Sequence, residues 1–480
     1  MDTHHVDVAV LGAGTAGLGA FAAARRHTDN VLLIERGPHG TTCARVGCMP
    51  SKLLIAAADA VHHTRQAETF GIQAGNVRID GRAVMARIKR ERDRFVESVL
   101  GSVERIPPAQ RIEGTARFAD DHTVVIDESW RIVAERFVIA TGSRPSVVPF
   151  LEAAEDRLLV NDSLFELDDL PESVAVFGPG VIGLELGQAL SRLGVRVRMF
   201  GIGGAVGPIH DDAVRECARA TFNAEFPLDP DAEVTDLSRE GDGVTVSWKD
   251  PGRGDVSESF SHLLAATGRR ANVDGLQLKN TGLDLDDRGV PIHDPHTLQC
   301  GNAPIFIAGD VNDRLQILHE ASDEGRIAGS NAGTYPDVRA GLRRTPLAIV
   351  FTDPQIAAVG LNITEIAERC PAGFAVGEVD FGDQGRSRVM ARNRGLLRVY
   401  GEQGTGLFLG AEMFGPAAEH IGHLLAWAAQ QRMSVSAMLS MPFYHPVIEE
   451  GLRTALRELN HNLRVDPKMV EQCMECGPGS

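Results

Sequence analysis

The 480-residue chain lacks the features that mark several common classes of protein. No apolar run reaches the roughly twenty residues of a membrane-spanning helix, and the N-terminal stretch MDTHHVDVAVLGAG has no basic segment of the kind that begins a signal peptide. Positive charge is also scarce, because 48 Lys and Arg face 65 Asp and Glu, for a net charge of -17. We therefore expect neither nucleic acid nor a membrane as a partner.

Cysteine is scarce as well, and its odd count of seven, scattered along the chain, does not resemble the disulfide framework of a secreted protein. We expect a reducing, cytoplasmic setting. There, a cysteine pair at short spacing is more often catalytic or metal-binding than structural. Three cysteines have no partner at useful spacing and are expected to be buried thiols: Cys217, Cys300 and Cys370.

What the chain does contain is two glycine-rich turns, each between an apolar strand and a helix-like stretch. The first follows the pattern Gly12-x-Gly14-x-x-Gly17, and the strand after its helix ends on Glu35, about twenty residues further on. The glycines allow a tight turn and close backbone approach, and the helix N-terminus faces a pyrophosphate. This pattern predicts a dinucleotide site in which Glu35 accepts hydrogen bonds from ribose hydroxyls.

The second turn, Gly178-x-Gly180-x-x-Gly183, repeats this arrangement in the middle of the chain. Its following strand, however, ends without an acidic residue that would bind an unphosphorylated ribose. Arg196 and Arg198 precede that strand end, and alternation places both on one face. The choice between NAD and NADP therefore stays open at this point.

Residues 40–52, GTTCARVGCMPSK, contain the one closely spaced cysteine pair outside the C-terminal tail, Cys43 and Cys48. If a helix begins here, the two lie about one turn apart on one face, which allows a disulfide. The helix N-terminus would also lower the pKa of a thiol there. Arg45, three residues before Cys48, is expected either to favour its thiolate, to meet an acidic substrate group or to face solvent. Two half-buried structural thiols are the alternative reading of the pair.

The ordered set of motifs resembles the flavin disulfide oxidoreductases, the family of dihydrolipoamide dehydrogenase, glutathione reductase and mercuric reductase. Besides the two glycine turns, the segments similar to family motifs are GTTCARVGCMPSK, FVIATGSRP (137–145), LLAATGRRAN (263–272), PIFIAGDVN (304–312) and FYHPVIEEG (443–451).

This resemblance implies an α/β fold with two Rossmann-like dinucleotide-binding domains and a C-terminal α+β dimerisation domain. We predict a discontinuous FAD-binding domain because Asp310 must return to the flavin. The predicted boundaries are 1–150 with 275–344 for FAD, 151–274 for NAD(P), 345–465 for dimerisation, and a flexible tail at 466–480 carrying Cys473 and Cys476.

The resemblance also implies the cofactors, FAD and NAD, with no metal among them. The residues expected to bind FAD are Gly12, Gly14, Gly17, Glu35, Thr141, Gly142 and Asp310. Those expected to bind the nicotinamide nucleotide are Gly178, Gly180, Gly183 and Gly268.

By the same resemblance, Cys43 is the more exposed interchange thiol and Cys48 the charge-transfer thiolate next to the flavin. Lys52 and Glu185 are expected to form an ion pair beside the flavin N5. The expected catalytic base is His445, oriented by Glu450 and supplied by the partner subunit, so the active site of the homodimer is shared.

The activity implied is that of a dihydrolipoamide dehydrogenase, which passes electrons from a dihydrolipoyl group, free or on a carrier protein, to NAD. One alternative is an NADPH-driven mercuric or other disulfide reductase that uses Cys473 and Cys476. A non-catalytic, flavin-bound redox sensor is an alternative of another class.

Overall fold

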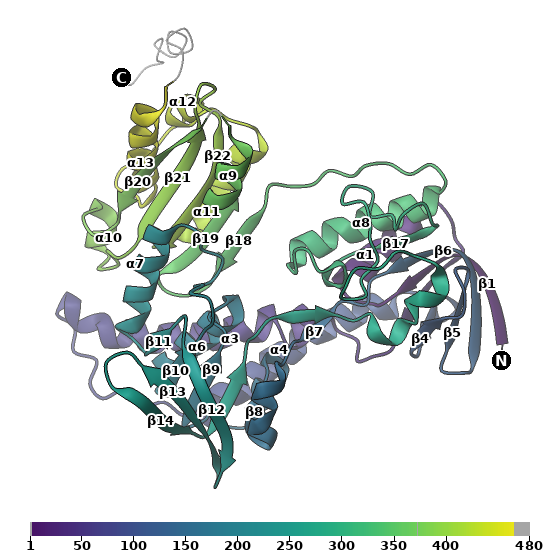
Figure 1. Cartoon of the computed structure of the whole chain (residues 1–480), viewed down its shortest axis with the longest axis horizontal. Helices are drawn as coiled ribbons and strands as arrows, with labels where there is room; N and C mark the ends of the chain where they lie inside the picture. The colour runs from purple at the N-terminus through teal and green to yellow at the C-terminus, as the bar shows by residue number, and fades with distance from the viewer. Residues whose placement is uncertain (1, 372, 465–480) are drawn as a thin grey trace.

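The computed structural model describes residues 2–371 and 373–464, so Cys473 and Cys476 lie outside the described residues. Figure 1 shows three regions, each built around its own β-sheet. Two of them combine parallel strands with helices and the third is antiparallel. The predicted α/β fold class is confirmed, whereas the domain boundaries stay a prediction.

The first region contains a seven-stranded sheet in which β1, β2, β3, β6 and β17 run parallel. Its strand β17 comes from far along the chain and pairs with β6, which returns the residues near 307 to the N-terminal sheet. The strands are β1 (Asp2–Leu11), β2 (Val31–Glu35), β3 (Arg111–Glu113), β4 (Ala116–Phe118), β5 (Thr123–Ile126), β6 (Trp130–Ile139) and β17 (Ile305–Ile307).

Two helices, α1 (Thr15–Ala24) and α8 (Leu318–Thr334), pack against each other beside this sheet. Their contact is close because α8 carries glycine where it crosses α1. A Cβ atom on Gly325 would lie 2.2 Å from the carbonyl oxygen of Ala16. Small residues thus fix the helix that follows the first glycine turn.

A helical hairpin links the first region to the second. It consists of α2 (Thr42–Arg45), α3 (Cys48–Gln66) and α4 (Gly81–Glu104). Leu54 of α3 and Ile88 of α4 belong to the same buried cluster as Leu186 and Leu190 of α6 (Val181–Arg192). The cysteine-bearing segment therefore packs on the helix that follows the second glycine turn.

The second region contains a five-stranded parallel sheet in the order β11-β10-β9-β15-β8. An antiparallel three-stranded sheet, β12-β13-β14, lies beside it. The elements are β8 (Leu158–Leu159), α5 (Asn161–Leu164), β9 (Ser173–Phe177), β10 (Arg196–Phe200), α7 (Asp212–Asn223), β11 (Leu228–Asp229), β12 (Glu233–Glu240), β13 (Gly243–Asp250), β14 (Gly254–Phe260) and β15 (His262–Ala265). A short pair, β7 (Ser143–Pro145) with β16 (Arg269–Ala271), lies between the first and second regions.

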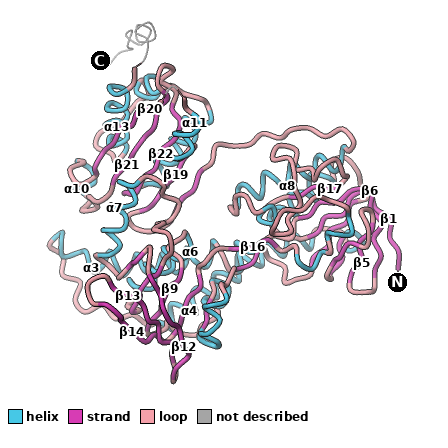
Figure 2. The backbone as a smooth tube through the Cα atoms, in the orientation of Figure 1, coloured by secondary structure: helices cyan, strands magenta, loops and turns pink. Residues whose placement is uncertain are grey.

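The third region is an antiparallel sheet, β18-β19-β22-β21-β20, packed against helices (Figure 2). Its strands are β18 (Leu347–Val350), β19 (Gln355–Gly360), β20 (Phe374–Asp380), β21 (Leu396–Glu402) and β22 (Phe408–Gly415). Its helices are α9 (Ile363–Arg369), α10 (Gly385–Val389), α11 (Ala418–Gln430), α12 (Val435–Leu439) and α13 (Glu449–Asn462). Among the described residues, no helix is both long and apolar enough to cross a membrane.

Candidate active site

The first glycine turn has a backbone that tolerates a side chain at only one of its three glycines. Gly12 has φ of 109°, and a Cβ atom there would lie 2.3 Å from the carbonyl oxygen of Ala140. A Cβ on Gly17 would lie 1.8 Å from the carbonyl oxygen of Gly12. Gly14 would meet no atom within 4 Å. The middle glycine therefore opens the space in front of the N-terminus of α1, where a phosphate is favoured.

Glu35 lies beside this turn and helps to shape it. Its carboxylate accepts hydrogen bonds from the backbone N–H groups of Ala13, at 2.6 Å, and Gly37, at 3.0 Å. With Gly12 and Thr141 it lines a cavity of about 220 Å³. A carboxylate facing this cavity suits the ribose of a dinucleotide, as the sequence predicts.

The second turn has nearly the same backbone conformation as the first. Gly178 has φ of 103°, and its Cβ would lie 2.4 Å from the carbonyl oxygen of Ala266. A Cβ on Gly183 would lie 2.0 Å from the carbonyl oxygen of Gly178, and one on Gly180 would meet no atom within 4 Å. The second turn can therefore accept a pyrophosphate in the same way as the first.

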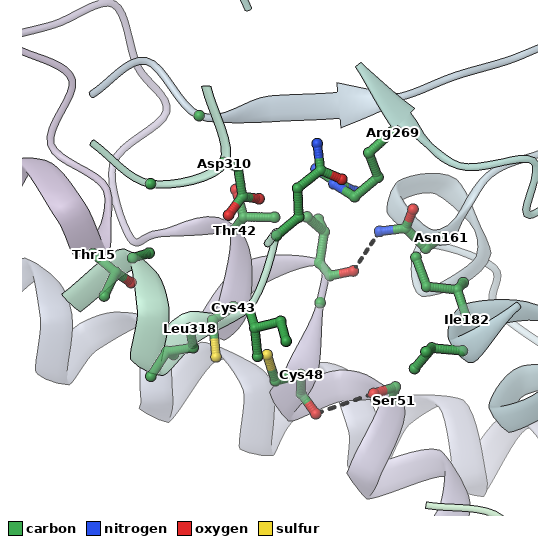
Figure 3. Close-up of a pocket in the computed structure, with 18 of the residues that line it drawn as sticks. Thr15, Thr42, Cys43, Cys48, Ser51, Asn161, Ile182, Arg269, Asp310 and Leu318 are labelled. Atoms are coloured by element: carbon green, nitrogen blue, oxygen red, sulfur yellow. Dashed lines mark hydrogen bonds between the residues drawn. The ribbon is translucent and has the colours of Figure 1, made fainter. Parts of the chain in front are cut away.

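Both turns open into one cavity of about 640 Å³ between the first and second regions. This volume lies in the usual range for a cofactor site. Figure 3 shows Cys43 and Cys48 on one side of the cavity, with Asp310 and Arg269 across from them. The predicted site residues that line it are Gly14, Cys43, Cys48, Lys52, Gly142, Gly180, Glu185, Gly268 and Asp310.

Asp310 is positioned by one direct hydrogen bond and by contacts that fix the turn on which it lies. It follows β17 at a turn in which Gly309 has φ of 78°, and its carboxylate accepts a hydrogen bond from Ser143 Oγ at 2.8 Å. Glu324 of α8 accepts from the N–H of Gly309 at 2.8 Å and from the side chain of Asn312 at 2.7 Å. Sequence reasoning missed Glu324, because the sequence does not show that this helical acid is buried.

The two cysteines do not share a helix, so that expectation was wrong. Cys43 lies in the short α2 and Cys48 is the first residue of α3. Gly47, with φ of -118° and ψ of -113°, separates them because its backbone leaves the helical region. The chain fold nevertheless brings the two thiols close enough for each to shift the pKa of the other. Both cysteines are free thiols in this structure.

The exposure of the two thiols also differs from the prediction, because Cys48 is exposed and Cys43 is half-buried in the single chain. The interaction with Cys43, together with the charge of Lys52, lowers the pKa of Cys48 to about 7. The same interaction and burial raise the pKa of Cys43. The thiolate therefore resides on Cys48, which is the order expected of a charge-transfer thiol.

Of the roles weighed for Arg45, the structure does not support stabilisation of the Cys48 thiolate. Its guanidinium donates to the carbonyl oxygen of Pro38 at 3.5 Å, and it is not on the helix of Cys48. The cation that stabilises the Cys48 thiolate is Lys52. We find no support in the structure for a role of Arg45 at the thiol.

Lys52 and Glu185 form the ion pair that the family resemblance implies, with 2.8 Å between Nζ and Oε2. Only 4% of the Glu185 surface is exposed. Phe351, which sequence reasoning missed, donates its N–H to Glu185 Oε1 at 3.0 Å, and its ring lies 4.6 Å from Lys52 Nζ. Nothing in the local sequence VFTDP signalled this contact, because it depends on how the third region meets α6.

His445 and Glu450 also pair as predicted, with Nδ1 of the imidazole 3.0 Å from the carboxylate. The N–H of Val447 donates to the same carboxylate at 3.3 Å, a contact made by the backbone and so independent of the side chain at that position. The His445 side chain is 81% exposed and does not line the cavity of the cysteines in its own chain.

The end of β10 carries neither acid nor cation. Arg196 and Arg198 both pair with Glu258 of β14, so they are directed to the three-stranded sheet. Gly201 follows the strand, and a Cβ there would lie 2.6 Å from the carbonyl oxygen of Pro230. Asp229 pairs with Phe200 in the neighbouring strand β11, and Asp231, two residues further on, accepts a hydrogen bond from the N–H of Gly203 at 2.7 Å.

Comparison with known proteins agrees with this geometry. Residues 6–325 match the family described as pyridine nucleotide-disulphide oxidoreductase, and residues 347–456 match its dimerisation domain. The chain belongs to this family. The predicted membership is thereby confirmed, and so is the prediction that the protein is a disulfide oxidoreductase enzyme of the kind that uses FAD and NAD(P). The open Gly14 and Gly180 positions, each in front of a helix N-terminus, fit those two dinucleotides.

Relatives of this family member match nearly its whole length. Dihydrolipoyl dehydrogenase of Bacillus subtilis is 30% identical over 94% of this chain and 97% of its own. Mercuric reductase of Shigella flexneri is 30% identical over 95% of this chain and 81% of its own. Among solved structures, LpdA of Mycobacterium tuberculosis shares the fold, with a TM-score of 0.80 and 24% identity over 96% of this chain and all of its own.

Proposed function

We propose that this oxidoreductase is a dihydrolipoyl dehydrogenase that oxidises a dihydrolipoyl group and reduces NAD. The observation that supports this proposal best is that both glycine turns open into the cavity that contains Cys43, Cys48 and the Lys52–Glu185 pair. Electrons can therefore pass from a thiol substrate to a nicotinamide within a single site. Relatives named dihydrolipoyl dehydrogenase match nearly the full chain, which agrees with this substrate.

In the proposed reaction, a thiolate of the substrate attacks Sγ of Cys43 in the Cys43–Cys48 disulfide. A mixed disulfide forms and Cys48 leaves as a thiolate, which is favourable because its pKa is lowered to about 7. The second substrate thiol then attacks its own sulfur in the mixed disulfide. This step releases a cyclic disulfide product and leaves both electrons on the two cysteines.

The substrate proton is proposed to go to the partner subunit's His445. Within one chain, His445 lies outside the cysteine cavity and is highly exposed, as expected of a base that serves a neighbouring subunit. Glu450 bonds Nδ1, so Nε2 is the proposed base atom. The presence of a dimerisation domain supports this arrangement.

Bound FAD would take the two electrons from the cysteines and deliver them as a hydride to the nicotinamide. This chain would hold FAD with the first glycine turn, Glu35 and Asp310, and the nicotinamide nucleotide with the second turn. Lys52 would stay next to the flavin because Glu185 fixes it. We propose NAD over NADP, because the segment after β10 offers no cation to a 2′-phosphate. We also propose a cytoplasmic location and a lipoylated carrier protein as partner.

The test is anaerobic reduction of NAD by dihydrolipoamide with the purified, flavin-loaded protein. Cys43→Ser should abolish turnover, and His445→Gln should lower kcat at least about a hundredfold because general-base catalysis is lost. His461, an exposed histidine on α13, the helix that carries Glu450, gives the matched control: His461→Gln should keep full activity. Slow lipoamide chemistry beside fast NADPH-driven reduction of Hg(II) would instead favour the mercuric reductase reading.

The shared site has a sharper test. Neither Cys43→Ser nor His445→Gln protein should turn over alone, but a heterodimer of the two contains one site with both residues intact if His445 acts across the interface. Mixing and re-association should therefore restore activity to about half per heterodimer. Absence of any rescue, with heterodimers shown to form, would place both residues in a site within one chain.

A further inference from the structure

Helix α6 presents a row of three buried polar side chains to its neighbours. Glu185, Gln188 and Arg192 follow each other at intervals of three and four residues, which places them on one face of the helix. Their exposed fractions are 4%, 3% and 5%. Buried polar side chains need hydrogen-bond partners. Of these three residues, only Glu185 has a role in the proposed reaction.

Gln188 and Arg192 both bind the segment 351–353, which follows the first strand of the antiparallel region. The Gln188 amide accepts from the N–H of Asp353 at 2.8 Å and donates to its carbonyl oxygen at 2.9 Å. Arg192 donates to the same carbonyl oxygen at 2.7 Å and to Asp353 Oδ2 at 3.2 Å. Two side chains of α6 thus fix this segment from one side.

The other end of the same segment contacts the ion pair. Phe351 donates its N–H to Glu185 and lies under Lys52. Arg192 also reaches Asp59 of α3 at 3.4 Å, about two helix turns beyond Lys52. The hydrogen bonds of Gln188 and Arg192 therefore determine where Phe351 stands relative to Lys52 and Glu185.

We propose that Gln188 and Arg192 are positioning residues for the active site. By fixing segment 351–353 they hold Phe351 against the Lys52–Glu185 pair, and so keep the charge of Lys52 next to Cys48. The inference rests on the proposed role of that ion pair, but it does not depend on which disulfide substrate the enzyme uses.

The consequence is electrostatic. Loss of the hydrogen bonds from Gln188 and Arg192 to segment 351–353 lets water reach the ion pair. Water screens the charge of Lys52 and weakens its effect on the Cys48 thiol. The groups that act on Cys48 are Cys43, Lys52 and Glu185, and those around Arg192 are Asp59, His62, Glu225 and Asp353. None of the second set acts on Cys48 directly. Loss of the Gln188 or Arg192 hydrogen bonds should therefore affect Cys48 through Lys52, and the pKa of Cys48 should rise.

The experiment measures the rate at which iodoacetamide alkylates Cys48 as a function of pH, read by mass spectrometry of its peptide. It uses the flavin-loaded dimer in a Cys43→Ser background, with and without Gln188→Met, which fills a similar volume without the amide hydrogen bonds. We expect the midpoint of the rate profile to rise by about half a pH unit or more. Arg192→Leu should act in the same direction and Arg192→Lys less.

The matched control is Asn331→Leu, another buried amide that both donates to and accepts from one backbone residue, here the carbonyl and N–H groups of Arg339, which lies eight residues along the chain. It should lower thermal stability without moving the midpoint. An unchanged midpoint in Gln188→Met, beside a stability loss like that of Asn331→Leu, would reduce Gln188 to a structural residue. If Arg192→Leu does not fold, Gln188→Met decides alone. Alkylation needs no lipoyl substrate, so its failure is distinct from failure of the proposed activity.

Discussion

The two glycine turns share one backbone and differ at the end of the following strand. In both, the first glycine has φ above 100° and faces a carbonyl oxygen across the sheet, and the middle glycine opens toward a ligand. In the first turn the strand ends on Glu35, which bonds the turn itself. In the second the strand ends on Phe200, and Gly201 follows it. Phosphate binding and ribose recognition are therefore separable parts of this fold.

Packing explains why the second strand end carries glycine. A Cβ on Gly201 would lie 2.6 Å from the carbonyl oxygen of Pro230 and 2.7 Å from Cγ of Pro179. Pro179 stands between the first two glycines of the second turn, and the first turn has Ala13 there, whose N–H bonds Glu35. A proline has no N–H, so a carboxylate after β10 would lack that donor as well.

The largest expected effect comes from replacing, one at a time, the first and the middle glycine of the first turn by alanine. Gly12→Ala should destabilise the fold by about 1–3 kcal/mol or more, because it combines unfavourable φ with a backbone collision. Gly14→Ala should leave the fold intact and reduce bound flavin, since its methyl group meets only ligand space. Flavin absorbance and thermal unfolding of the apoprotein separate the two. Equal flavin loss at equal apoprotein stability would contradict the distinction.

Gly180→Ala tests the same logic in the second turn. It should keep the flavin and its spectrum, and raise KM for the nicotinamide nucleotide about tenfold, the cost of a lost pyrophosphate contact. Steady-state kinetics with varied nucleotide at saturating dihydrolipoamide give the measurement. Loss of flavin in this variant would show that the two turns are not independent sites.

A third prediction concerns the cavity where the two turns meet. Because the pKa of Cys48 is lowered to about 7, its thiolate is present above that pH and is lost below it. Lipoamide-linked turnover should fall as pH drops below about 7, whereas NADH oxidation by ferricyanide, which needs both turns but no thiol, should not follow that titration. Cys48→Ser should keep the ferricyanide reaction and lose the lipoamide reaction. A parallel pH decline in both assays would assign the titration to another group.

The parts of the site that could be predicted from sequence are those fixed by local pattern. Gly12, Gly178 and the His445–Glu450 spacing follow from short motifs whose backbone geometry is local, and the structure places them accordingly. The Cys43–Cys48 segment was misread because Gly47 interrupts an otherwise helical pattern. Phe351 was out of reach, because its contact joins segments 166 residues apart.

The smallest effect is expected at the second strand end, where the two turns differ most. Asp231 accepts a hydrogen bond from the N–H of Gly203, just after the strand end where a ribose binds in this fold. Asp231→Asn keeps the hydrogen bond but removes one exposed negative charge, so kcat/KM for NADPH relative to NADH should rise only about threefold. Gly201→Asp should not recreate the Glu35 arrangement; it should lower stability instead, because Pro230 and Pro179 occupy the space. A gain in NAD affinity in Gly201→Asp would contradict this. It would show that β11 can move to make room, so that packing does not explain why the second turn lacks an acid.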